Sequence, residues 1–106
     1  MARVLRADHV DNDLLEIGRF IAERSGSIDT ALRFLDQIDE KCSQYAGQPE
    51  MGDARPDLGR NIRLFPVGNY VVIYQPLADG IIVLMVTRGN RNIPRVFAQR
   101  QRGLSS

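Results

Sequence analysis

The chain has 106 residues and a mass of 11.9 kDa, enough for one domain with a modest core and too little for two. Hydrophobic residues make up 43% and charged residues 25% of it, a balance typical of a globular domain rather than of a disordered tail or a fibre. The longest apolar runs, 67–74 and 81–86, are far shorter than the ~20 residues of a membrane span, and we expect no signal peptide. We therefore expect one cytoplasmic domain over residues 1–106, with a core at 3–97 and a basic tail at 98–106.

The chain has few side chains that could bind a metal or take part in redox chemistry. The single cysteine, Cys42, excludes an internal disulfide and a cysteine-based metal site, and the single histidine, His9, excludes a centre built from several histidines. We expect Cys42 to be a buried, inert thiol and His9 to lie at the surface or cap a helix. The sequence therefore predicts no metal and no cofactor.

Charge is divided unevenly along the chain. Residues 1–58 carry seven basic and twelve acidic side chains, whereas residues 59–106 carry seven arginines and one acid, Asp79. This asymmetry indicates an acidic partner or a nucleic acid for the second half. The alternative is a set of ordinary solvated arginines that reflects a GC-rich coding bias.

Residues 11–24 predict the first helix, because large apolar residues recur there every three or four positions. Asp13, followed three residues later by Glu16, is typical of a capping box, so we expect the helix to begin near Asp13. Gly26 is expected to end the helix in a left-handed conformation.

A second helix is predicted over residues 28–45. One face of it carries apolar side chains at alternating spacings of four and three: Ala31, Leu35, Ile38, Cys42 and Tyr45. Because the connection between the helices is short, they should pack as an antiparallel hairpin. The stretch 47–59 contains two prolines and three glycines, so we expect a connecting loop; the other interpretation is that it positions Arg63.

Three strands are predicted to follow. Alternation over 61–67 and the apolar or aromatic runs at 70–75 and 81–87 predict strands joined by tight turns at 68–69 and 78–80. The last run is almost entirely apolar, which is typical of a central strand buried on both faces.

The chain ends supply two weaker signals. Residues 2–7 can add a strand to the same sheet, and residues 93–102 are open between a helix and a frayed edge, with 96–106 expected to be disordered until bound. The predicted fold class is α+β: an N-terminal strand, an antiparallel two-helix hairpin, then a three-stranded antiparallel meander, all in one mostly antiparallel sheet. The hairpin should cover one face of the sheet and leave the other solvated or used.

No self-contained active site can be assembled from these residues, since no nucleophile elbow and no phosphate-binding glycine loop is present. What remains are the arginines and the aromatic residues of the second half. Arginines that converge on one sheet face can grip RNA phosphates or an acidic peptide; alternatively, they are scattered surface residues. The candidates for contacting a target or a partner protein are Arg60, Arg63, Arg88, Arg91, Arg95 and Phe97.

Several segments together resemble a known family. Residues 13–22 and 31–34 of the predicted helices, and residues 53–59, 62–74 and 81–93 after them, resemble the ParE branch of the ParE/RelE toxin superfamily. Their order and spacing agree with the layout predicted independently, and the resemblance covers nearly the whole chain.

The resemblance implies a single RelE/ParE-like toxin domain that a ParD-like antitoxin wraps and neutralises in a hetero-oligomeric complex. It also implies DNA gyrase as the target, whose inhibition blocks replication. We expect the antitoxin to present an acidic, amphipathic segment that pairs with Arg60, Arg63 or the C-terminal arginines. We expect no membrane partner and no direct sequence-specific nucleic-acid binding.

The RelE branch, whose members cut messenger RNA in the ribosomal acceptor site, supplies the alternative. Such nucleases carry a Gly-Tyr-Arg triplet where this chain has Asn-Tyr-Val at 69–71, and a C-terminal tyrosine where it has Phe97. Valine cannot bind phosphate and phenylalanine has no hydroxyl to move a proton, although Arg91 matches an arginine of the nucleases. We therefore expect a gyrase-directed toxin that is not an enzyme.

Two alternatives stay open. The first is a divergent, ribosome-dependent mRNA endoribonuclease that relies on Arg63, Arg88 and Arg91. The second is a non-toxic relative that only binds its antitoxin.

Overall fold

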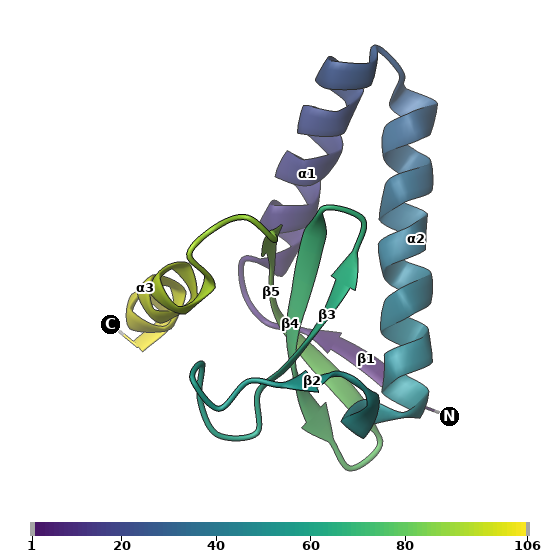
Figure 1. The fold of residues 1–106 in the computed structure, drawn as a ribbon. Helices are drawn as coiled ribbons and strands as arrows, with labels where there is room; N and C mark the ends of the chain where they lie inside the picture. Colours follow the sequence, from purple (N-terminus) through teal and green to yellow (C-terminus); the bar gives the residue numbers. More distant parts are fainter. Residues whose placement is uncertain (1, 106) are drawn as a thin grey trace.

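Residues 2–105, which the computed structural model describes, form five strands and three α-helices around one sheet (Figure 1). The strands are β1 Arg3–Arg6, β2 Asp53–Ala54, β3 Arg63–Val67, β4 Tyr70–Leu77 and β5 Gly80–Arg88. The helices are α1 Val10–Ser25, α2 Ile28–Gly47 and α3 Ile93–Ser105, with a short 3-10 turn, η1, at Pro49–Met51. None of the described helices is long and apolar enough to cross a membrane. The α+β class is confirmed, whereas η1, β2 and α3 add to the predicted layout.

The strand order in the sheet is β1-β5-β4-β3-β2. Strands β3, β4 and β5 form the predicted antiparallel meander, and β2 adds to its outer edge. Strand β1 pairs with β5 in parallel, with Arg3 opposite Gly80. The helical hairpin carries the chain from β1 across one face of the sheet before the meander begins. The predicted pairing of the first strand within the sheet is confirmed, as is the interior position of β5, which lies between β1 and β4.

Helix α1 begins at Val10, three residues before the predicted capping box. His9 precedes it with a φ of 76°, and its side chain makes no capping hydrogen bond. Asp13 is 8% exposed and accepts a hydrogen bond from the backbone N–H of Val86 at 3.1 Å. The capping-box prediction is wrong, because tertiary partners occupy the carboxylate. The predicted end of the helix is confirmed, with Gly26 at a φ of 69°.

Helices α1 and α2 pack as the predicted antiparallel hairpin on one face of the sheet (Figure 1). The expected stripe of α2 faces the sheet: Ala31, Ile38 and Cys42 are at most 5% exposed. Tyr45, at the end of that stripe, stacks on Phe65 of β3 with ring centroids 4.0 Å apart. Burying these side chains against the sheet is the main stabilisation of the hairpin.

Helix α3 covers the opposite face of the sheet (Figure 1). Ile93 and Phe97 of α3 are 7% and 2% exposed and pack with Ile62, Leu64 and other residues of a second apolar cluster. The uncertain C-terminal segment is therefore helical, and the second face is buried. The expectation of disorder from residue 96 onward is wrong up to Ser105, because α3 has apolar side chains at helical spacing to bury; Ser106 lies outside the described residues.

Cys42 is expected to resist thiol reagents until the protein unfolds. Burial, aided by the carboxylate of Asp39 and opposed by Arg6, raises the pKa of Cys42 from 9.0 to about 11. At pH 8 the folded protein therefore keeps the thiol protonated and covered. Labelling with a chromogenic disulfide, with and without denaturant, measures this protection, and fast labelling of the folded protein would contradict it.

The same pKa shift has a consequence for stability. The stabilisation linked to the Cys42 thiol is complete below pH 9, where the thiol is protonated in both states. It should decline between pH 9 and about 11, because the unfolded chain ionises first. Denaturant titrations across this range, with Cys42→Ala as the reference protein, isolate the contribution.

Candidate functional site

Two open grooves adjoin where α1 passes the ends of β4 and β5. The first, of about 540 Å³, lies between α1, β5 and α3, and the second, of about 830 Å³, lies between the hairpin, the β3–β4 turn and the β5–α3 connection. Phe20, Tyr70 and Arg88 line both grooves. We call the two together the α1–β5 groove and these three residues its centre.

A cation–π contact lies at the centre of the groove. The guanidinium carbon of Arg88 is 4.1 Å from the ring centroid of Phe20, and that of Arg24, one helical turn after Phe20, is 5.6 Å from the same centroid. Phe20 is 38% exposed despite these contacts. Stacking on the ring holds the Arg88 guanidinium inside the groove. Aromatic and arginine side chains of this kind supply much of the binding energy at protein interfaces.

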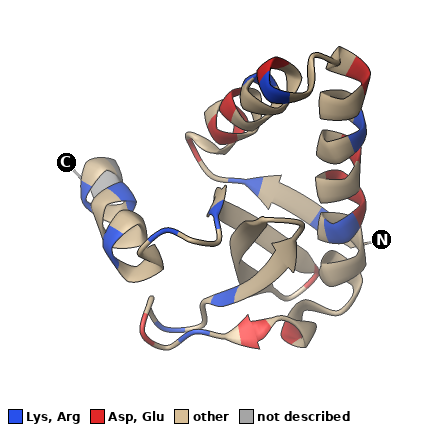
Figure 2. Ribbon diagram, turned by 45° about the horizontal axis from the view of Figure 1, so that its top comes forward, with Lys and Arg blue, Asp and Glu red and all other residues tan. Residues whose placement is uncertain are grey.

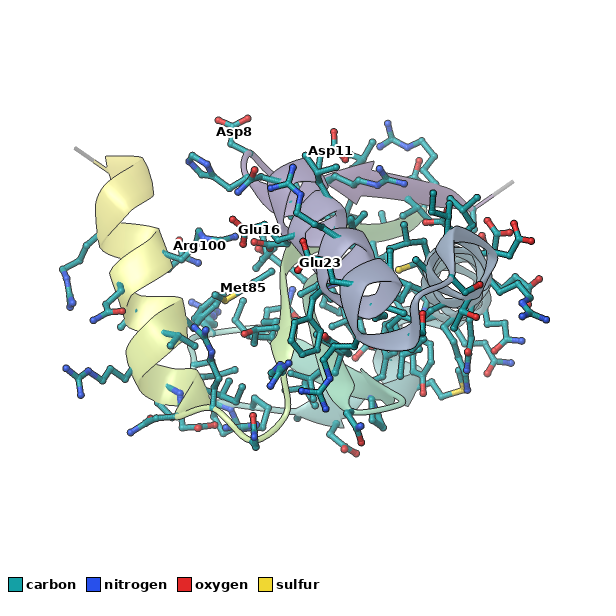
Figure 3. The ribbon with its side chains drawn as sticks, turned by 90° about the horizontal axis from the view of Figure 1, so that it is seen from above. Asp8, Asp11, Glu16, Glu23, Met85 and Arg100 are labelled. Carbon is teal, nitrogen blue, oxygen red and sulfur yellow. The ribbon has the colours of Figure 1, made fainter. Side chains whose placement is uncertain are left out.

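A buried ion pair forms the wall of the first groove. Figure 3 shows Arg100 reaching from α3 toward α1, on the side where Glu16 and Met85 lie. Its Nη2 and Nη1 contact the Oδ1 and Oδ2 of Asp13 at 2.7 and 3.1 Å, and the two side chains are 18% and 9% exposed. The pair joins α1 to α3 across 87 positions of sequence, so it sets the width of the groove.

The structure brings together two of the predicted arginines and separates a third. Arg88 and Arg91 both line the first groove. Arg63 pairs with Tyr74 on β4, whereas Arg88 pairs with Tyr70, and four residues along a strand correspond to about 13 Å. Arg63 therefore lies on the same face of the sheet as Arg88 but at the other end of the strands, so the expectation that these arginines converge is wrong for Arg63.

Arg63 instead binds residues of η1 and the loop that follows it. Its Nη1 donates to the carbonyls of Glu50 and Gly52 at 2.9 and 2.6 Å, and its Nη2 contacts the Glu50 carboxylate at 2.8 Å. The Tyr74 hydroxyl donates to the Pro49 carbonyl at 2.7 Å and accepts from the Gly52 N–H at 3.0 Å; burial is the main cause that raises the pKa of Tyr74. The interpretation of 47–59 as a mere connection is therefore wrong, since η1 and Arg63 hold each other in place.

The remaining candidates lie outside the groove. Arg60 and Arg95 are exposed, one in the loop before β3 and the other in the first turn of α3. Phe97 is only 2% exposed and belongs to the second apolar cluster. While α3 is docked, Phe97 has no free face for a partner, so its expected role as a contact residue is wrong in this conformation.

Reasoning from the sequence missed Phe20, Tyr70 and Arg100. Phe20 could have been found from the sequence, because a large ring at the margin of an apolar helical stripe is often half exposed. No sequence pattern identifies Arg100, since its partner Asp13 is fixed only by the packing of α3 on the sheet.

The groove supplies binding groups more readily than a catalytic set. Its lining includes arginines and aromatic residues, together with the buried Tyr70 and Thr87, and neither His9 nor Cys42 lines it. Within residues 2–105, no three His, Cys, Asp or Glu side chains are grouped as the ligands of a metal would be. The arrangement suits a partner surface that offers carboxylates beside apolar side chains.

Comparison with known proteins places these features in a family. A sequence model described as the ParE toxin of the type II toxin–antitoxin system parDE matches residues 4–93. The solved structure described as the chromosomal ParDE TA system from P. aeruginosa is similar in fold, with a TM-score of 0.69 at 18% identity over 83% of this chain and 96% of that one. No curated protein matches the chain. Because the family match spans most of the sequence, the chain belongs to the ParE family of type II toxins.

Proposed function

We propose that this protein inhibits DNA gyrase by binding it and that a ParD-like antitoxin neutralises it in a hetero-oligomeric complex in the cytoplasm. The observation that carries the proposal is the family match over residues 4–93, which includes every strand of the sheet except the first residue of β1. The α1–β5 groove supports a binding role, because it joins an exposed ring to an arginine that it holds in place.

A binding mechanism without catalysis is supported by two positions. Val71 stands where RelE-like nucleases have a phosphate-binding arginine, and its side chain packs against the second apolar cluster. Phe97 stands where they have a tyrosine, and it is buried in the same cluster. Neither position offers a charge or a hydroxyl to a reacting phosphodiester.

The antitoxin segment proposed for this groove is acidic and amphipathic. Arg88 and Arg91 offer guanidiniums to its carboxylates, and the exposed ring of Phe20 offers a contact to its apolar side chains. Arg63 is not assigned to this contact, because it lies outside the groove and its Nη1 and Nη2 already bind Glu50 and the Gly52 carbonyl.

A supercoiling assay with purified gyrase tests the target. The isolated protein should inhibit supercoiling, and premixing with the antitoxin should relieve the inhibition. Phe20→Ala with Arg88→Ala should weaken inhibition at least about tenfold, since hot-spot truncations of this kind cost 2 kcal/mol or more. Arg19→Ala with Arg33→Ala, which changes two exposed arginines of the hairpin outside the groove, is the matched control. Folded protein that leaves supercoiling untouched would refute gyrase as the target.

One observation favours a second candidate, an mRNA endoribonuclease that acts on the ribosome. Arg88 and Arg91 do meet in one groove, as phosphate contacts require. Under this reading, Arg91→Ala should abolish cleavage of messenger RNA on translating ribosomes without unfolding the domain. Absence of both cleavage and gyrase inhibition would leave the non-toxic, antitoxin-binding relative.

A further inference from the structure

The charge asymmetry of the sequence becomes a spatial separation in the fold. Helices α1 and α2 together carry eight acidic and four basic residues, whereas residues 89–105 carry four arginines and no acid. In Figure 2 the charged residues along α3 are all blue, whereas the hairpin on the other side of the sheet carries red residues among its blue ones. The net charge of +1 therefore conceals an acidic pole and a basic pole.

The exposed residues of the basic pole form one surface. It comprises the β5–α3 connection and the outer side of α3, with Asn90, Arg91, Asn92, Arg95, Gln99 and Arg102 exposed. Arg60 adjoins this surface, because Leu58 and Ile62 on either side of it pack into the same cluster as α3. We call it the basic face.

The chemistry of the basic face distinguishes between classes of partner. Every exposed large hydrophobic residue lies elsewhere among the described side chains: Leu5, Leu15, Phe20, Ile28, Leu32 and Met51. A protein interface needs apolar anchors at its centre, and the basic face offers none among residues 89–103. Arginine, asparagine and glutamine are the side chains that contact sugar and phosphate in nucleic acids.

The basic face exposes no aromatic ring, and this favours a double-stranded over a single-stranded nucleic acid as its ligand. Binding to single strands depends on stacking bases against aromatic side chains. The one aromatic residue between 89 and 103, Phe97, is 2% exposed.

We propose that the basic face binds the phosphate backbone of double-stranded DNA without regard to sequence. The acidic hairpin points away from the duplex and orients the protein on it. The basic face shares Asn90 and Arg91 with the rim of the α1–β5 groove, whereas Arg60 and Arg95 lie outside it. The proposed DNA contact does not depend on gyrase being the target. With Arg60, Arg91 and Arg95 each neutralising a phosphate, the slope of log affinity against log salt should be about −3.

Fluorescence anisotropy with a labelled 25-base-pair duplex of arbitrary sequence, at salt concentrations from 50 to 200 mM, tests the proposal with the antitoxin-free protein. Arg60→Ala with Arg95→Ala removes two phosphate contacts that lie outside the groove. This variant should bind at least about tenfold more weakly at 50 mM salt and lose about 2 from the slope. The matched control, Arg19→Ala with Arg33→Ala, removes the same charge from the exposed surface of the hairpin and should change affinity by less than about threefold.

Each contrary result has a definite meaning. Equal losses in the two double variants would show a net-charge effect and overturn the basic face as the site. Tighter binding to a single strand of the same length would overturn the duplex as the ligand. Absence of binding by the unaltered protein at 50 mM salt would overturn the proposal altogether, while leaving the gyrase assay unaffected.

Discussion

Replacing Arg100 with alanine is expected to lower the free energy of unfolding by about 3 kcal/mol. The guanidinium holds both oxygens of Asp13, and the two side chains are 18% and 9% exposed. Without it, the buried carboxylate keeps only the backbone N–H of Val86 as a described hydrogen-bond donor, and a buried charge left unpaired costs more than the lost contact. Denaturant unfolding measures the loss.

Two further variants separate this explanation from a general effect of losing an arginine. Arg3→Ala breaks the pair with Asp79, whose side chains are 57% and 51% exposed, so solvent screening should leave the unfolding midpoint nearly unchanged. Adding Asp13→Asn to Arg100→Ala should recover part of the stability, because the amide still accepts from Val86 without carrying a charge. Equal losses from Arg100→Ala and Arg3→Ala would contradict the buried pair.

Gly80→Ala is expected to lower the free energy of unfolding about as much as Arg100→Ala, but through a steric clash. A Cβ at Gly80 would overlap the carbonyl oxygen of Arg3 and lie 2.7 Å from its nitrogen, because β1 pairs with β5 at this point. Strand β1 would have to move away from β5, at a cost of about 3 kcal/mol. Thermal unfolding should report the loss, and hydrogen exchange should show faster exchange of the β1 amides.

Gly47→Ala is the matched control for this substitution. Gly47 ends α2, and a Cβ there meets no atom within 4 Å. Alanine has the higher helix propensity, so the variant should be unchanged or more stable by up to about 1 kcal/mol. Similar destabilisation by both substitutions would show that the crowding at Gly80 is not the cause.

The helices and the meander could be predicted because their signals are local. The stripe of α2, from Ala31 to Tyr45, repeats at helical spacing, and the turn at 68–69 has the composition of a tight hairpin. Local spacing gave a wrong prediction for Asp13, whose distance of three residues from Glu16 matches a capping box although Asp13 does not cap the helix. Its actual partners, Val86 and Arg100, are supplied by β5 and α3.

The candidate site was predicted less completely than the fold. Composition identified arginines as the groups of interest, and Arg88 and Arg91 do line one groove. Sequence patterns could not show that Arg63 is held by Glu50, or that Phe97 is buried. A charged or aromatic residue has the same local signature whether it faces solvent, a partner or the core.

The sequence by itself determined the α+β class, the helical hairpin, the meander and the concentration of arginine in the second half, since each follows from the spacing or composition of neighbouring residues. Only the tertiary structure decided that α3 covers the second face of the sheet and that Phe20 and Arg88 meet. It also decided which arginines are available to a partner. These outcomes depend on residues far apart in the chain, such as Asp13 and Arg100, whose contact is set by the packing of whole elements and leaves no periodic trace in the sequence.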